Sequence, residues 1–230
     1  MSFFKNLIKN FSRSENFTER LAEFEQYIYT CVSCHQPLSF TELQPLTMVK
    51  YPSCNDLFLV PCKLDDWWVT APLGGGGMGA VYEGHYIGNP DLASAVKVLQ
   101  TGDNINPLFL TMLVKEAEIG ACFGTHPNLA QVYSYGNDGV SAFMIMALVE
   151  GTRFDHFIGD HKYGTSEELS LYFMLDILSA LEYMFQCGYL YRDLKPENII
   201  VKEDGSITLV DYGLCLSVDE AWYNDDDDIL

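Results

Sequence analysis

Four polar side chains lie close together near the end of this 230-residue sequence. Asp193, Lys195 and Asn198 fall within six residues, and Asp211 follows after two short β-rich runs. Mg²⁺ prefers oxygen ligands and uses few protein carboxylates, so Asn198 and Asp211 are candidates to bind this ion. Asp193 is the better candidate for a base that orients an attacking hydroxyl. The ammonium of Lys195 would offset negative charge on the group that is transferred.

A glycine-rich segment precedes this group in the sequence. Gly74-x-Gly76-x-x-Gly79 alone is a weak signal, because dinucleotide folds and phosphate loops both contain it. A dinucleotide site would need a helix after the glycines and an acid about 20 residues later. Here β-type residues follow, and the residue 18 positions after the last glycine is Lys97. This order predicts a hairpin whose backbone amides approach phosphate oxygens, with Lys97 reaching up to them.

A lysine buried in such a site needs an acidic partner. Two glutamates lie on the helix predicted over residues 108–123, and either could pair with Lys97. The position of Glu116 in the helix favours it over Glu118. The alternative is that both glutamates face water.

To bring these residues together, the chain must fold into several structural parts. No internal repeat is evident, and we expect an α+β protein. The four predicted parts are an amphipathic-helix region at 1–30, a loop-rich cysteine module at 31–66, a β-rich part with one helix at 67–150, and a largely helical part with an acidic tail at 151–230.

The net charge of −19 excludes a broad basic surface, so we expect no nucleic-acid partner. No run reaches the roughly 18–20 apolar residues that span a bilayer. Residues 1–13 lack a secretory signal, which favours a cytoplasmic location and reduced thiols. The same residues form an apolar helix face with flanking basic side chains. Such a helix either lies on a membrane surface or a partner, or packs on its own domain, and we favour packing.

The glycine loop, Lys97, Glu116, the Tyr191–Asn198 loop and Asp211-Tyr-Gly213 occur together in the order and approximate spacing of protein kinases, so the chain resembles that family. The resemblance is strongest to bacterial Ser/Thr kinases. It implies a two-lobe fold with a β-rich small lobe and a helical large lobe, and ATP and Mg²⁺ as cofactors. It also implies catalytic roles for Asp193 and Lys195. The positions implied to contact ATP are Leu73, Gly74, Gly76, Gly79, Val81, Ala95, Lys97, Glu116, Met146 and Leu148.

Three features depart from the family pattern. Tyr191 stands where the family usually has His, and Tyr212 stands where it usually has Phe. Neither change removes a catalytic group. Only 17 residues follow Gly213, and none of them resembles the Ala-Pro-Glu anchor, so the large lobe is expected to be truncated.

The cysteine module predicts a structural zinc site. Cys31-x-x-Cys34 is a good half-site, because thiolates at this spacing can share one tetrahedral ion. The segment resembles the zinc-ribbon modules found ahead of some bacterial kinases, which usually carry two such pairs. Here Tyr51 stands at one expected ligand position, so Cys54 and Cys62 complete the predicted set, with His35 as the rival of Cys62. The alternative is a set of four free thiols.

The sequence therefore predicts an ATP- and Mg²⁺-dependent Ser/Thr protein kinase, whose acceptors can include the chain itself. A second hypothesis is an ATP-binding pseudokinase or scaffold that acts through a partner protein. A third is a kinase-derived modifier with a non-protein acceptor. The acceptor and the oligomeric state are not specified by these patterns.

Overall fold

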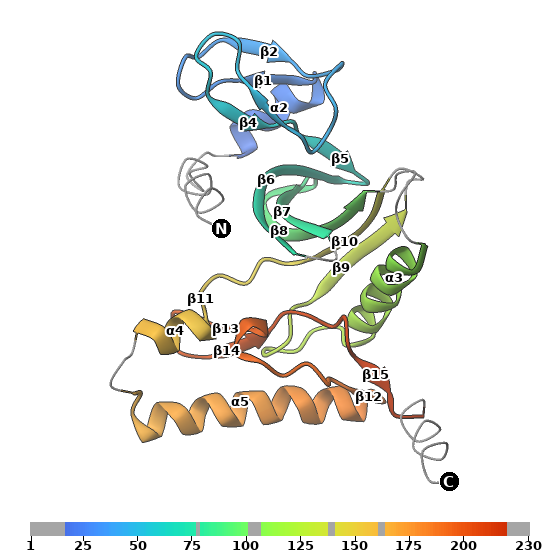
Figure 1. Ribbon diagram of the computed structural model, residues 1–230, viewed down its shortest axis with the longest axis vertical. Helices are drawn as coiled ribbons and strands as arrows, with labels where there is room; N and C mark the ends of the chain where they lie inside the picture. Colours follow the sequence, from blue (N-terminus) through green and yellow to red (C-terminus); the bar gives the residue numbers. More distant parts are fainter. Residues whose placement is uncertain (1–16, 77–78, 101–106, 138–140, 161–163, 220–230) are drawn as a thin grey trace. The chain divides into compact units, whose positions relative to one another are not determined.

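The computed structural model describes residues 17–76, 79–100, 107–137, 141–160 and 164–219 (Figure 1). The chain divides into two compact units. The first contains residues 1–102 and 137–145, and the second contains residues 103–136 and 146–230. The helix predicted over residues 1–13 and the acidic tail lie outside the described residues.

The first unit begins with a small aromatic subdomain. Helix α2 packs against β1, and two antiparallel hairpins, β1–β2 and β3–β4, follow it in the chain. The elements are α2 (Phe17–Glu25), β1 (Ile28–Thr30), β2 (Pro37–Ser39), β3 (Met48–Lys50) and β4 (Leu57–Leu59). Most buried side chains of this region are aromatic, and they form one cluster with Trp68 of the following sheet: Phe17, Phe24, Cys31, Phe40, Tyr51, Phe58, Val60 and Trp68. A cluster of this kind gives the subdomain a hydrophobic core of its own.

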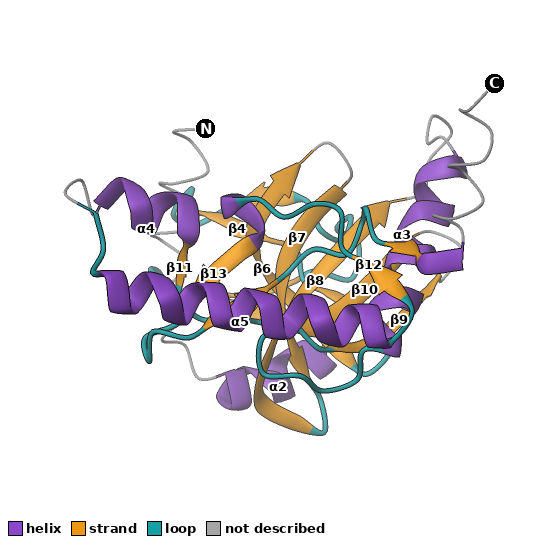
Figure 2. Ribbon diagram, turned by 90° about the horizontal axis from the view of Figure 1, so that it is seen from below, coloured by secondary structure: helices purple, strands orange, loops and turns teal. Residues whose placement is uncertain are grey.

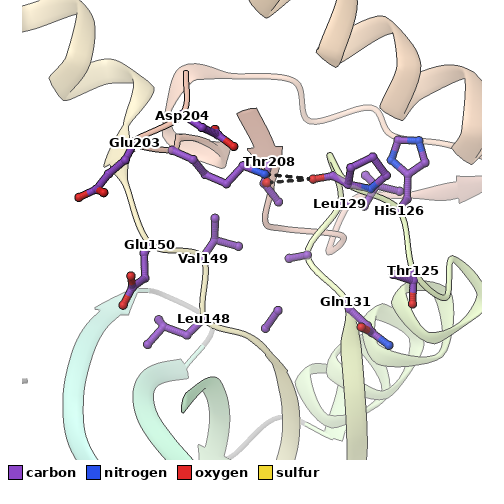
Figure 3. Close-up of a pocket in the computed structure, with 14 residues that line it drawn as sticks. Thr125, His126, Leu129, Gln131, Leu148, Val149, Glu150, Glu203, Asp204 and Thr208 are labelled. Carbon is purple, nitrogen blue, oxygen red and sulfur yellow. Dashed lines mark hydrogen bonds between the residues drawn. The ribbon is translucent and has the colours of Figure 1, made fainter. Parts of the chain in front are cut away.

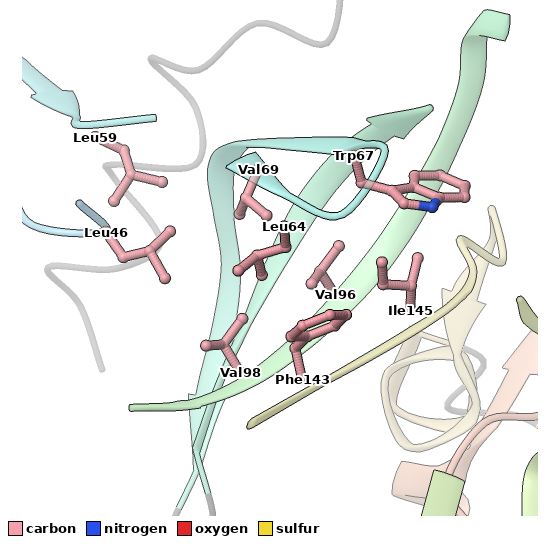
Figure 4. Packing of buried hydrophobic residues seen from close by; sticks show 9 residues of the cluster. All are labelled: Leu46, Leu59, Leu64, Trp67, Val69, Val96, Val98, Phe143 and Ile145. Carbon is pink, nitrogen blue, oxygen red and sulfur yellow. The ribbon is translucent and has the colours of Figure 1, made fainter. Parts of the chain in front are cut away.

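A larger antiparallel sheet follows in the first unit, with the strand order β5-β6-β7-β8-β10. A sixth strand, β9, belongs mostly to the second unit. The strands are β5 (Cys62–Leu64), β6 (Trp67–Gly76), β7 (Gly79–Tyr86), β8 (Asn89–Gln100) and β10 (Ser141–Ala147). One face of the sheet carries a hydrophobic core that includes Val96, Val98 and Phe143 (Figure 4). Successive side chains of a strand point to opposite faces, so this core determines which residues of β8 face the other way.

The second unit combines helices with short antiparallel strand pairs. Strand β13 lies between β11 and β14, and β12 pairs with β15. The elements are α3 (Pro107–Cys122), β9 (Val132–Asn137), β11 (Thr152–Arg153), α4 (Phe154–Asp160), α5 (Glu167–Gln186), β12 (Tyr189–Leu190), the 3₁₀ turn η1 (Pro196–Asn198), β13 (Ile199–Val201), β14 (Ile207–Leu209) and β15 (Leu216–Ser217). The two short β-rich runs that precede Asp211 in the sequence form the hairpin β13–β14.

Helix α5 is the longest helix described (Figure 2). The hydroxyl of Ser166 accepts a 3.1 Å hydrogen bond from the backbone N–H of Leu169 and so caps the first turn of the helix. The helix ends before Gly188, whose φ of 86° suits a glycine stop. One side of α5 buries Phe173, Ile177, Ala180 and Met184. Other apolar side chains of α5 are more than half exposed: Leu171, Tyr172, Met174, Leu175, Leu178 and Phe185.

The two units divide the chain differently from the four predicted parts. The predicted small lobe ran from residue 67 to residue 150, whereas α3 and most of β9 belong to the second unit. Residues 17–66 belong to the same unit as the main sheet rather than to a separate one. No helix among the described residues combines the length and apolar character needed to cross a membrane.

Candidate active site and cysteine cluster

In the first unit, three of the predicted ATP-contact residues share one face of the sheet. Val81 pairs directly with Lys97 across β7 and β8. Ala95 lies two residues before Lys97, so it points to the same face. Val96 and Val98, which alternate with them, are buried in the core on the opposite face. Packing of the core on one face therefore fixes Val81, Ala95 and Lys97 on the opposite face of the sheet.

The glycine segment forms the predicted hairpin. Strand β6 ends at Gly76, β7 begins at Gly79, and these two residues pair with each other. The strand register shifts between Pro72 and Gly74, so Leu73 lies at an irregularity of β6. Gly79 has φ 131°, and a Cβ there would lie 2.8 Å from the carbonyl oxygen of Val98. Both constraints require glycine at this position.

The predicted catalytic loop lies entirely in the second unit. The ammonium nitrogen of Lys195 lies 2.6 Å from Oδ2 of Asp193. The amide nitrogen of Asn198 donates a 2.8 Å hydrogen bond to the same oxygen and a 3.1 Å bond to the backbone carbonyl of Asp193. Asn198 is buried at the end of η1, and its backbone carbonyl accepts from Val210. Two donors on one oxygen fix the orientation of the Asp193 carboxylate.

The backbone around this loop is strained at one residue. Arg192 has φ 64°, a conformation that side chains other than glycine rarely adopt. Its neighbour Tyr191 is buried, and the Tyr191 hydroxyl has no hydrogen-bond partner among the described residues. Strain and unsatisfied polar groups concentrate at functional sites, which fits the role predicted for the loop.

The carboxylates of Asp211 and of Glu116, which lies on α3, both come close to the backbone at Gly213. Oδ1 of Asp211 accepts a 2.9 Å hydrogen bond from the N–H of Gly213. A Cβ added to Gly213 would lie 3.4 Å from a carboxylate oxygen of Glu116. Glu116 is 5% exposed, whereas Glu118 is exposed, so burial agrees with the preference for Glu116.

The side chain of Tyr212 packs against α3 and the segment that follows it. Its hydroxyl donates a 2.7 Å hydrogen bond to the backbone carbonyl of Ala130, and its ring meets Phe123 edge to face at 5.3 Å. A Cβ on Gly120 of α3 would lie 2.8 Å from the Tyr212 ring. The side chain of Tyr212 is therefore a packing group of the turn at Asp211-Tyr-Gly213. Its hydroxyl bond is an additional contact that the sequence did not suggest.

The carboxylates of this unit concentrate negative charge. Burial and the charges of Asp211 and Glu116 raise the pKa of the Cys215 thiol to about 12. Burial and the charge of Asp211 raise the pKa of Tyr191 well above its usual value. Buried carboxylates are costly unless a cation pairs with them. The donor set of Asn198 and Asp211, which offers amide and carboxylate oxygens, fits Mg²⁺.

The predicted adenine-contact residues of the second unit lie where β10 ends. Met146 is buried, and the backbone N–H of Ala147 donates a 2.8 Å hydrogen bond to the carbonyl of Gln131. Leu148 lines a pocket of about 500 Å³ in the second unit (Figure 3). On the other side of this pocket, the ammonium of Lys202 and the hydroxyl of Thr208 each lie 3.4 Å from the carbonyl oxygen of Pro127. None of the predicted catalytic side chains lines this pocket.

Three of the predicted zinc ligands lie together in the first unit. The sulfur atoms of Cys31, Cys34 and Cys54 all lie within 4.8 Å of one another. The sulfur atoms of Cys31 and Cys54 are 3.5 Å apart. Among the described residues, neither Cys62 nor His35 joins this group. The Cys62 thiol lies 3.8 Å from the carbonyl of its neighbour Lys63. Cys62 packs against the core of the main sheet, because β5 pairs with β6 of that sheet.

Two thiols of this group, those of Cys31 and Cys54, have pKa values displaced in opposite directions. Burial works against ionisation of Cys31, but the backbone N–H groups of Ser33 and Cys34 outweigh it and lower the pKa of the Cys31 thiol. A hydrogen bond from the backbone of Asp56 acts against burial at Cys54. Burial and the Cys31 thiol nevertheless raise the pKa of Cys54 to about 11. A metal ion that bound all three thiolates would therefore displace protons.

The comparison with known proteins supports the resemblance. The family model described as protein kinase domain matches residues 67–225. An Aurora kinase of Eremothecium gossypii is 32% identical over 66% of this chain and 40% of its own length. Serine/threonine-protein kinase PknA of Mycobacterium tuberculosis is 32% identical over 64% of this chain and 34% of its own length.

A third relative matches more of this chain. Serine/threonine-protein kinase PknD of Protochlamydia amoebophila is 27% identical over 86% of this chain and 21% of its own length. The chain thus spans less than half the length of each of these three relatives. Because the kinase domain model matches more than half of it, this chain belongs to the protein kinase family.

Proposed function

We propose that this protein transfers the γ-phosphate of ATP to serine or threonine hydroxyls in a Mg²⁺-dependent reaction. The observation that carries the proposal is the hydrogen-bonded group of Asp193, Lys195 and Asn198, present in a chain of the protein kinase family. The relatives named as serine/threonine-protein kinases support these hydroxyls as acceptors.

Asp193 orients the attacking hydroxyl in this proposal. Its carboxylate is held through Oδ2, so it presents a fixed geometry to the acceptor and receives the proton of the hydroxyl. Lys195 is bound to the same carboxylate, and this hydrogen bond raises the pKa of its ammonium. A lysine that stays protonated stabilises the negative charge of the phosphoryl group during transfer.

Asn198 and Asp211 hold the Mg²⁺. The Asn198 amide nitrogen donates to Asp193, so the amide oxygen lies on the other branch of the side chain and can serve as a ligand. Asp211 adds a carboxylate that is oriented by the N–H of Gly213. When bound, the ion neutralises charge on the phosphates of ATP. It also balances the carboxylates that crowd this unit.

The remaining ATP contacts follow the sequence prediction. The backbone amides of the hairpin at Gly74, Gly76 and Gly79 and the ammonium of Lys97 bind the phosphates, with Glu116 as the acidic partner of Lys97. The other residues of the ATP site are Leu73, Val81, Ala95, Met146 and Leu148. The shared face of Val81, Ala95 and Lys97 supports this assignment within the first unit. A reaction that consumes ATP agrees with a cytoplasmic location.

Phosphotransfer tests the proposal directly. The full chain is incubated with Mg²⁺ and ATP labelled at the γ-phosphate, with a general protein substrate and without it. We expect label transfer that Asp193→Asn and Lys97→Met abolish. The matched controls Asp160→Asn and Lys63→Met change exposed residues of the same type and should leave transfer intact. Transfer that survives in both test variants would refute the catalytic assignment.

One observation favours a second function, that of an ATP-binding module acting through a partner protein. Helix α5 exposes six large apolar side chains, and exposed apolar surface of this kind is typical of contact sites. A rise in melting temperature with Mg-ATP, without any label transfer, would support this second function. The absence of both effects would contradict both functions.

We also infer that the cysteine module binds zinc. Three thiols that come within 4.8 Å of one another form a donor set that suits this ion. The sequence-derived candidates for a fourth ligand, Cys62 and His35, do not lie in the group.

A further inference from the structure

The two hairpins of the cysteine module repeat one geometry, which the sequence did not reveal. The loop of residues 31–36 joins β1 to β2, and the loop of residues 51–56 joins β3 to β4. In each loop, the fifth residue donates its N–H to the carbonyl of the first, at 2.9 Å and 2.8 Å. The N–H of the first residue donates to the carbonyl of the sixth, at 3.1 Å and 2.7 Å. The equivalent pairs are Cys31 and Tyr51, Cys34 and Cys54, His35 and Asn55, and Gln36 and Asp56.

The backbone confirms this equivalence. The fifth residue of each loop has a positive φ, 55° at His35 and 62° at Asn55. The loops are therefore two copies of one turn, displaced by 20 residues. Both fourth positions are cysteine, and so is the first position of the first loop. Only at the first position of the second loop does Tyr51 replace the expected thiol.

Tyr51 connects the two loops by another means. Its hydroxyl donates a hydrogen bond to the carbonyl of Gln36 in the first loop and lies 3.2 Å from the carbonyl of Tyr29. Its ring is 2% exposed and meets Phe58 edge to face at 5.7 Å. A fourth thiolate would have joined the loops through the metal, whereas the phenol joins them directly.

The other candidate ligands do not fill the open position. Cys62 packs against the core of the main sheet, and its thiol faces the Lys63 carbonyl. His35 lies at the positive-φ position of the first loop, beside the cysteine pair in sequence, yet outside the group of sulfur atoms. Among the described residues, the ligand group therefore contains three members.

We propose that Cys31, Cys34 and Cys54 bind one zinc ion as three thiolates, with water as an exchangeable fourth ligand. Tyr51 performs the structural role of the missing ligand by hydrogen bonding between the loops. Structural zinc sites are closed by four protein ligands, whereas sites with three protein ligands keep an open position. The module should therefore stay folded without metal and bind zinc reversibly. This inference rests on the zinc site proposed above and is independent of kinase activity.

Cobalt substitution tests the coordination in the full chain without ATP. The intensity of the sulfur-to-cobalt charge-transfer band reports the number of bound thiolates. We expect three thiolates in the unchanged protein and in the control Cys62→Ser, and fewer in Cys54→Ser. Tyr51→Cys should give four thiolates and tighter metal binding in competition with a chelator.

Three outcomes would overturn the proposed site. Four thiolates in the unchanged protein that fall to three in Cys62→Ser would assign Cys62 as the fourth ligand. A shift of the cobalt spectrum in His35→Ala would assign His35. Metal binding by Tyr51→Cys alone would show that the natural site does not hold the ion.

The role of Tyr51 is tested by melting the metal-free chain. Tyr51→Phe keeps the ring and removes the hydroxyl, so we expect its melting temperature to fall by a few degrees. The control Tyr27→Phe removes the hydroxyl of an exposed residue and should leave the melting temperature unchanged. Equal melting temperatures for both variants would contradict the structural role of the Tyr51 hydroxyl.

Discussion

The predicted catalytic loop and the cysteine module reach their geometry by different means. In the loop, Asp193, Lys195 and Asn198 are joined by direct hydrogen bonds over six residues of sequence. In the module, the thiols of Cys31 and Cys54 come from two hairpins that an aromatic core holds together. The geometry of a short loop can thus be fixed by hydrogen bonds within the loop. The geometry of a thiol cluster from two distant turns depends on the hydrophobic core that holds the turns together.

The largest expected effect concerns the aromatic core of the module. Phe58 is 2% exposed and stacks on Tyr29 at 4.8 Å. Phe58→Ala should lower the free energy of unfolding of the first unit by about 3–5 kcal/mol, measured by urea denaturation with a chelator present. The control Leu57→Ala changes a more exposed residue of the same strand and should cost much less. Full recovery of Phe58→Ala on adding zinc would show that metal rather than packing holds the module.

The next effect concerns the carboxylate predicted to bind Mg²⁺. Asp211→Asn keeps the size of the side chain and removes its charge, so phosphotransfer should fall by on the order of 10²–10³-fold. The melting temperature should change little, because the hydrogen bond from Gly213 needs only an oxygen. Asp219→Asn, at an exposed site, is the matched control. A loss of less than threefold would contradict the assignment of Asp211.

A smaller effect separates two tyrosines of the catalytic region. Tyr212→Phe breaks the bond to Ala130 and leaves a buried carbonyl unpaired, which should cost about 1 kcal/mol of unfolding free energy. Tyr191→Phe removes a buried hydroxyl that has no partner among the described residues, so stability should stay equal or rise. Chemical denaturation of both variants measures the difference. A larger loss for Tyr191→Phe would indicate an additional partner for its hydroxyl.

The smallest expected effect is on stability, and it comes from an ion pair at the start of α4 whose contribution depends on pH. The hydrogen bond from Arg153 lowers the pKa of Asp155 from 3.8 to about 2. A pKa lowered in the folded state stabilises the protein above the unfolded value near 4, and this contribution is lost as the pH falls toward 2. Because both side chains are partly exposed, we expect less than about 1 kcal/mol.

The measurement is the melting temperature of the unchanged protein minus that of Asp155→Asn. This difference should be positive above pH 5 and vanish near pH 2. Asp160→Asn, at the exposed end of the same helix, should show no such trend. A difference that grows on acidification would contradict the assigned direction of the pKa change.

The sequence predicted the elements whose signals are local. The helix predicted over residues 108–123 is present in the structure as α3. The glycine hairpin and the hairpin of residues 199–210 follow turn residues between β-rich runs. The group of Asp193, Lys195 and Asn198 was predictable for the same reason, since few residues separate its members.

The sequence was less informative where contacts join distant segments. It suggested Cys62 as a fourth metal ligand, and the structure instead packs this residue against the main sheet. The sequence showed no repeat, because the two loops of the module have the same backbone geometry but few residue types in common. It treated Tyr51 as a missing ligand, although the hydroxyl makes a bond that depends on the position of Gln36.

The amino-acid sequence by itself indicated the family, the candidate catalytic side chains and the turns that carry them, because each depends on residues close together in the chain. Only the tertiary structure decided which thiols meet, which glutamate is buried and what Tyr212 and Tyr51 bond to. Those outcomes depend on how hydrophobic cores bring distant backbone segments together. A hydrogen bond or a thiol cluster between such segments exists only after the cores have formed.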